Sequence, residues 1–133
     1  MPLLPLRVEL RITRRPGVPE QVVQEAIQRV FDTREHEDGT RGFFAPANFD
    51  FGKPVYRSNV IATAMRVPGV MNVEVRVFRP LDVGRALAGS SALAGGWQGV
   101  DVIEAQPLEI IELRNDPAHP EHGSISFEFV EGA

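Results

Sequence analysis

The sequence predicts an α+β domain of two layers, in which an antiparallel or mixed sheet of about four strands is covered on one face by two helices. Two observations predict this class. Each candidate strand has one apolar face, and the elements follow in the order strand, helix, helix, strand, excursion, strand, strand. Strands with one apolar and one polar face are typical of sheets that are covered on a single face. A parallel dinucleotide-binding fold would instead need continuously apolar strands and a glycine-rich turn before a helix.

Length, composition and charge narrow the class of protein further. The chain has 133 residues, of which 43% are hydrophobic, and no segment resembles a linker, so we expect one domain spanning residues 1–133. The absence of cysteine excludes disulfide scaffolds, thiolate metal sites and cysteine nucleophiles. A net charge of −4 with scattered basic residues argues against a nucleic-acid partner. No apolar run reaches the roughly 18 residues of a membrane span, so we expect a soluble, cytoplasmically made protein without a membrane partner.

The first half of the chain contains a strand and two helices. Residues 6–13 alternate strictly and predict the strand. Pro19 suits the first position of a helix, while Ser58 is a candidate cap for a shorter helix that the Pro-Gly pair at 68–69 ends. The apolar stripes expected to face the core are Val22, Val23, Ala26, Ile27, Val30 and Phe31 in the first helix, and Val60, Ile61, Ala64 and Met65 in the second.

The second half predicts three more strands and one long excursion. The strands are Met71–Val77, which Pro80 closes, then Leu108–Leu113 and Ser124–Glu131, with Ile125, Phe127 and Phe129 facing inward. Residues 115–123 have the composition of a turn between the last two strands. Residues 82–99 are rich in glycine and alanine, so we expect a surface excursion with one helical turn near residues 85–93 and Trp97 as its only large side chain.

The segment Asp116-Pro117-Ala118-His119-Pro120-Glu121-His122 is the strongest chemical candidate. Its two imidazoles and two carboxylates are ligand types that zinc or nickel prefers. The two prolines prevent the helix that would bring His119 and His122 to one face, and no third ligand follows at a recognisable spacing. We therefore expect a solvated hairpin connection, with a metal-dependent enzyme as a minor alternative. No serine lies in a nucleophile elbow, so we assign no catalytic, cofactor-binding or metal-binding residue.

A loop rich in aromatic residues precedes the second helix. Phe43, Phe44, Phe49 and Phe51 lie in a stretch without helical period, and each would contribute about 1.5–3 kcal/mol if buried. The loop is therefore expected to fold back onto the domain or onto a partner.

Several motifs, in order, resemble the C-terminal region of baseplate J-like proteins, which are wedge components of contractile phage tails and related injection machines. They are Phe49-Asp50-Phe51-Gly52-Lys53-Pro54-Val55-Tyr56-Arg57-Ser58, Val67-Pro68-Gly69-Val70, the run from Leu108 to Pro117, and Pro120-Glu121-His122-Gly123. The resemblance covers most of the chain. Residues 82–99 have no counterpart in it, and the chain ends Gly132-Ala133 where the family has a Gly-Gly-like ending.

The resemblance implies a non-enzymatic structural module without cofactors. Its expected partners are other baseplate wedge subunits and copies of itself, and it would assemble in the bacterial cytoplasm into the baseplate of a phage, a prophage or an injection system. Because aromatic anchors dominate interface energetics, the candidate interface or local core residues are Phe43, Phe44, Phe49, Phe51, Tyr56 and Trp97. The alternative is a small-ligand-binding or regulatory α+β module with residues 82–99 as a lid.

Overall fold

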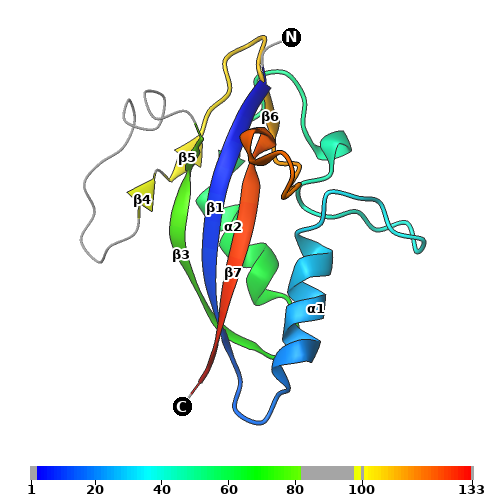
Figure 1. Ribbon diagram of the computed structural model, residues 1–133, viewed down its shortest axis with the longest axis vertical. Helices are drawn as coiled ribbons and strands as arrows, with labels where there is room; N and C mark the ends of the chain where they lie inside the picture. The colour runs from blue at the N-terminus through cyan, green and yellow to red at the C-terminus, as the bar shows by residue number, and fades with distance from the viewer. Residues whose placement is uncertain (1–2, 82–97, 100, 133) are drawn as a thin grey trace.

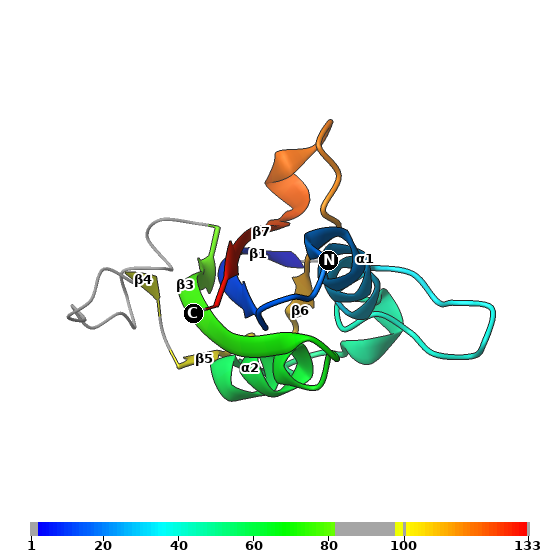
Figure 2. The same cartoon turned by 90° about the horizontal axis from the view of Figure 1, so that it is seen from below.

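The computed structural model describes residues 3–81, 98–99 and 101–132 (Figure 1). Its elements are β1 (Leu3–Arg14), α1 (Glu20–Val30), the 3-10 helix η1 (Pro46–Asn48), β2 (Val55–Tyr56), α2 (Arg57–Met65), β3 (Val70–Pro80), β4 (Gln98–Gly99), β5 (Val102–Ile103), β6 (Ile110–Glu112), the 3-10 helix η2 (Pro120–His122) and β7 (Ser124–Glu131). Both α-helices lie on the same side of the main sheet (Figure 2). The α+β class is confirmed.

β1 is the central strand of a mixed sheet. On one side β3 pairs with it antiparallel, from Leu6 opposite Pro80 to Arg14 opposite Val70. On the other side β6 pairs with its first residues and β7 with residues 7–14, both in the parallel direction. β4 extends the sheet beyond β3, and β2 pairs with β5 in a small separate sheet.

The predicted hairpin between the last two strands is wrong. β6 and β7 do not pair with each other but lie one after the other along the same edge of β1, which is 12 residues long and accommodates both. The strand predicted from Leu108 begins only at Ile110. Residues 113–123 therefore leave the sheet and return in the same direction instead of reversing.

The core lies between the sheet and the two helices. The even-numbered side chains from Leu4 to Ile12 are at most 3% exposed. Opposite them, the register shifts between Glu9 and Leu10, so that Arg76 is an extra residue in β3. Phe78 consequently faces the core in place of Val77, which the strict alternation of the sequence had assigned to that face.

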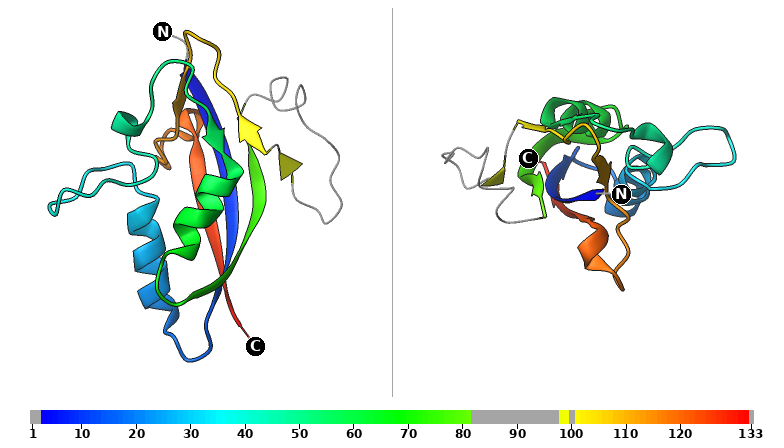
Figure 3. Two further views of the ribbon diagram at one scale, coloured as in Figure 1. Left: turned by 180° about the vertical axis from the view of Figure 1, so that it is seen from behind. Right: turned by 90° about the horizontal axis from the view of Figure 1, so that it is seen from above.

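The helices bury narrower stripes than the sequence predicted. α1 buries Val23 and Ile27, with Phe31 just beyond its end, but Val22 is 56% exposed. Seen from behind in Figure 3, α2 crosses β1 and β3. It buries Val60 and Ala64 and leaves Met65 at 43% exposure.

The expected helix starts need small corrections. Pro19 is the residue before α1 and not its first residue. α2 begins at Arg57, directly after β2, with Tyr56 in the capping position and no side-chain cap. Ser58 therefore lies inside the helix, and its predicted capping role is wrong, because the preceding strand already fixes the direction in which the helix starts.

The aromatic loop folds back onto the domain at the end of α1. The N–H of Phe43 donates to the carbonyl oxygen of Val30 at 2.8 Å. Neighbouring ring centroids then lie 4.9 to 6.3 Å apart, in the pairs Phe31–Phe43, Phe31–Phe44, Phe43–Phe44, Phe44–Phe49 and Phe31–Phe127. Such distances are favourable for aromatic pairs, so the cluster joins the loop to α1 and β7.

The predicted excursion and its helical turn, together with Trp97, lie outside the described residues, apart from the two residues of β4.

Gly42 is predicted to be essential for this packing. A Cβ on Gly42 would lie 1.9 Å from the carbonyl oxygen of Asp32, so Gly42→Ala must displace the loop from α1. We expect it to lower the free energy of unfolding by about 2 kcal/mol or more, measured by urea denaturation. Gly39→Asn is the control, because Gly39 has a φ of +85°, which asparagine tolerates, and open space around it. Equal stability of the two variants would contradict the prediction.

Candidate docking site

A groove of about 590 Å³ runs between β6 and the aromatic loop. Its lining is mostly apolar and ends in a group of polar side chains. The apolar lining residues are Leu3, Phe44, Pro46, Phe49, Ile110, Ile111 and Leu113, and the polar ones are Thr33, Glu112, Arg114 and Asp116. We call this feature the β6 groove. It brings together the two segments that the sequence analysis singled out separately, the aromatic loop and the segment that begins at Asp116.

Each wall of the groove is fixed by the fold. One wall is β6, which Leu3 holds through its pairing with Ile110. The other wall is η1, where Pro46 opens a single 3-10 turn. The side-chain amide of Asn48 donates to the carbonyl oxygens of Gly42 at 2.8 Å and Phe43 at 3.1 Å, which ties this turn to the aromatic cluster. The groove is therefore preformed.

The polar end of the groove is organised around Glu112. Its side chain is only 10% exposed and pairs through one oxygen with Nδ1 of His122 at 2.8 Å and through the other with Nε of Arg114 at 3.5 Å. The N–H of Arg114 donates to the carbonyl oxygen of His122 at 3.0 Å, which closes the loop between β6 and β7. Gly123, at φ +93°, permits the close approach, because a Cβ there would lie 2.9 Å from the carbonyl oxygen of Glu112.

The histidines of this loop are thus paired with carboxylates. Nδ1 of His119 lies 3.2 Å from Oε1 of Glu121, while His122 pairs with Glu112. Within the described residues, no group of three or more His, Asp or Glu side chains is placed to hold a metal ion. The two pairs close the loop between β6 and β7 and leave the charged side chain of Glu121 exposed.

Two carboxylates that follow α1 or lie in the loop before β7, Asp32 and Glu121, have a lowered pKa. Hydrogen bonds from its own backbone N–H and from His119 hold the pKa of Glu121 below its usual range. Burial raises the pKa of Asp32, but hydrogen bonds from Arg34 and from the N–H of Thr33 outweigh this and lower it. Both groups therefore stay ionised at neutral pH.

The candidate interface residues separate into a buried and an exposed set. Phe44 is 1% exposed and belongs to the core, while Phe43 and Phe49 are partly buried against it. Phe51 and Tyr56 are 49% and 47% exposed. Trp97 lies outside the described residues.

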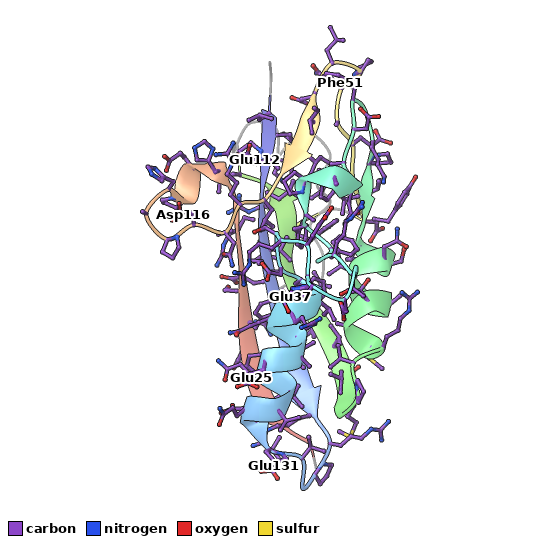
Figure 4. The ribbon with its side chains drawn as sticks, turned by 90° about the vertical axis from the view of Figure 1, so that its right-hand side faces the viewer. Glu25, Glu37, Phe51, Glu112, Asp116 and Glu131 are labelled. Atoms are coloured by element: carbon purple, nitrogen blue, oxygen red, sulfur yellow. The ribbon has the colours of Figure 1, made fainter. Side chains whose placement is uncertain are left out.

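Two exposed apolar residues near Phe51 were missed by sequence reasoning. Leu108 is 73% exposed and Leu3 is 41% exposed. The loop of Phe51 adjoins that of Leu108, because the N–H of Gly52 donates to the carbonyl oxygen of Glu109 at 2.9 Å. Leu3, Phe51 and Leu108 form what we call the apical patch, at the end of the molecule where β1 starts; Figure 4 shows Phe51 there.

Glu109 explains why Leu108 faces outward. Its carboxylate is buried and accepts the N–H of Gln106 at 2.9 Å, while its own N–H donates to the carbonyl oxygen of Gln106 at 2.9 Å. This tight turn places Leu108 at its tip. Sequence reasoning placed Leu108 at the start of a strand, although Pro107 directly before it was a signal for a turn.

The tie between β6 and the loop is predicted to contribute to stability. Glu112→Ala leaves His122 and Arg114 without their acceptor, so we expect a loss of about 1–3 kcal/mol in the free energy of unfolding, measured by urea denaturation. Glu121→Ala is the matched control in the same loop, because Glu121 is exposed, and it is expected to change stability little. A larger effect at Glu121 than at Glu112 would refute this account of the loop.

Comparison of the chain with protein-family models, with curated protein sequences and with solved structures gave no match. Among the residues that the structure describes, no helix is both long and apolar enough to cross a membrane. The interpretation of the β6 groove and the apical patch therefore rests on their geometry and on the motifs of the sequence.

Proposed function

We propose that the chain is a non-enzymatic structural module that docks onto other subunits of a phage-tail-like baseplate. The apical patch supports this most directly. Leu3, Phe51 and Leu108 expose 41%, 49% and 73% of their surface next to the mostly apolar β6 groove. Exposed apolar surface bordered by polar groups is typical of protein interaction sites, and large apolar anchors supply much of the binding free energy there.

The polar end of the β6 groove also favours docking. Both oxygens of Glu112 already have partners in His122 and Arg114, which fix the position of its charge. A partly buried carboxylate in a fixed position adds orientation and specificity to a docking surface.

The assignment to a baseplate comes from the motif resemblance, and the motifs have structural roles that such a module would need. The motif from Phe49 to Ser58 spans a loop, β2 and the start of α2. The motif Val67-Pro68-Gly69-Val70 forms the turn into β3, where Gly69 has a φ of +91°. Other wedge subunits and further copies of this chain are the proposed partners, assembled in the bacterial cytoplasm.

A second candidate is a small-ligand-binding module. The β6 groove, at about 590 Å³, lies within the range of about 300–1,000 Å³ that is usual for ligand pockets. Its lining would suit an apolar ligand with a hydrogen-bond donor directed at Glu112 or Asp116.

Capture of partners with a tagged chain tests the proposal. We expect the unaltered chain to capture tail or baseplate subunits from lysate of its native cells, identified by mass spectrometry. The variant Phe51→Asp/Leu108→Asp should lose them, because it charges the apical patch. The control Val22→Asp/Met65→Asp, which charges two exposed apolar residues on the helices, should retain them.

Capture of the same subunits by the Phe51→Asp/Leu108→Asp variant would refute the role of the apical patch. Capture of no tail protein by a folded chain, together with a rise in melting temperature on adding a small apolar compound that carries a hydrogen-bond donor, would favour the ligand-binding candidate.

A further inference from the structure

β7 has an open edge with outward-pointing backbone groups. It pairs with β1 in one continuous register over residues 124–131, and no other described strand pairs with it. The N–H of Ile125 points away from β1 and donates to Oδ1 of Asn115 at 3.2 Å, whereas the N–H of Gly132 donates to Arg14 of β1 at 2.8 Å. Since successive residues of a strand direct their backbone groups to opposite edges, Phe127 and Phe129 direct theirs outward, beyond the reach of the Asn115 cap.

A groove of about 440 Å³ accompanies this open edge. It separates β7 from α1, and most of its lining is polar. Gln24, Gln28, Phe31, Asp32 and Arg34 line it from the helix side, and Asn115, Ile125, Ser126, Phe127 and Phe129 line it from the strand side. Figure 4 views the molecule from the side on which β7 and α1 run next to each other. A strand added to β7 would direct alternate side chains toward this groove. There they would contact the rings of Phe127 and Phe129 and the amides of the glutamines, beside Asp32 and Arg34, which pair with each other at 3.1 Å.

The charges on the other face of the sheet form an incomplete row. Glu74 of β3, Arg11 of β1 and Glu128 of β7 lie opposite one another in register. Arg11 lies 3.6 Å from the Glu74 carboxylate and 3.1 Å from that of Glu128. The row therefore alternates in sign across three strands and ends at Glu128, whose side chain is 58% exposed. Because opposite charges on adjacent strands are stabilising, a strand added beside β7 should carry a cation opposite Glu128.

A second copy of β7 does not complete this row. The strand reads Ser-Ile-Ser-Phe-Glu-Phe-Val-Glu and contains no basic residue. Antiparallel pairing of two such strands would place Ser126, Val130 or another Glu128 opposite Glu128, according to the register. Glu25 on α1 and Glu131 at the end of β7 also lie on this side, the latter 3.8 Å from the guanidinium of Arg14 (Figure 4). The charge pattern thus favours a basic partner over self-pairing.

We propose that the open edge of β7 binds an extended basic segment of another protein, which adds to the sheet as a further strand. Its apolar residues lie over the groove between β7 and α1, and its alternating Lys or Arg residues lie on the polar face, one of them opposite Glu128. The outward backbone groups of Phe127, Phe129 and Glu131 supply the hydrogen bonds. This edge and the β6 groove are separate surfaces, so the inference does not depend on the baseplate assignment.

Amide hydrogen exchange measured by NMR tests the edge residue by residue. In the free chain, the amides of Phe127 and Phe129 are expected to exchange faster than those of Ser126, Glu128 and Val130, which face β1. The probe is a capped eight-residue peptide of alternating Val and Lys, and its matched control alternates Val and Glu. The Val-Lys peptide should slow exchange at Phe127 and Phe129, and the Val-Glu peptide should not.

Three outcomes of this experiment would overturn the proposal. They are equal binding of both peptides, binding of the Val-Lys peptide without slower exchange at Phe127 and Phe129, and no binding of it at millimolar concentration. If exchange at these amides slows as the protein concentration rises without any peptide, a second copy of the chain occupies the edge. That result would also overturn the proposal.

Two pairs of variants separate the charge from the backbone contribution. Glu128→Lys is expected to weaken binding of the Val-Lys peptide about fivefold and to confer binding of the Val-Glu peptide, whereas Glu128→Gln should have an intermediate effect. Glu131→Pro removes an outward N–H, which an edge strand tolerates, and should weaken binding about two- to tenfold more than Glu131→Ala. Equal affinities of Glu128→Lys and Glu128→Gln for the Val-Lys peptide, or of Glu131→Pro and Glu131→Ala, would count against the addition of a strand at this edge.

Discussion

The main sheet depends on β1, because both edges of this strand are paired and both of its faces are in use. β3 pairs along one edge, and β6 followed by β7 pair along the other. Its even-numbered side chains form the centre of the core, and its odd-numbered ones carry the charges of the open face. Since β6 and β7 share one edge, the chain between them must leave the sheet. The projecting segment 113–123 then separates the β6 groove from the open edge of β7.

The return of the aromatic loop to α1 determines which aromatic side chains remain exposed. Gly42 allows the loop to approach the end of the helix, so the rings of Phe43 and Phe44 pack at a tilt against that of Phe31. Burial of these rings removes their apolar area from water and gives the β6 groove a rigid wall. Phe51, farther along the same loop, stays exposed next to Leu108. Phe44 therefore belongs to the core, whereas Phe51 in the same loop lies on the surface.

The two candidate surfaces differ in the interactions that each would offer to a partner. The apical patch and the β6 groove present apolar area with a fixed carboxylate at one end, so shape and desolvation would dominate binding there. The edge of β7 presents unpaired backbone groups and ends a row of alternating charge, so hydrogen bonds and charge complementarity would dominate. Polar pairing within the chain keeps both surfaces ordered, through Glu112 and His122 on one side and through Arg11 and Glu128 on the other.

The sequence by itself determined the elements whose side chains repeat with a clear period. The alternation of β1, the buried positions Val23 and Ile27 of α1 and the bounds of β7 all follow from local pattern, because burial of one face imposes a period of 2 or 3.6 on the residues. Tertiary structure alone decided the direction of β6 relative to β7, since a turn rich in Pro, Asn and Gly permits either a reversal or a return. It also decided the bulge at Arg76 and the difference between Phe44 and Phe51. The bulge depends on the register between β1 and β3, and the burial of Phe44 depends on the close approach of Gly42 to the end of α1. Both bring together residues from different elements, so no local pattern predicts them.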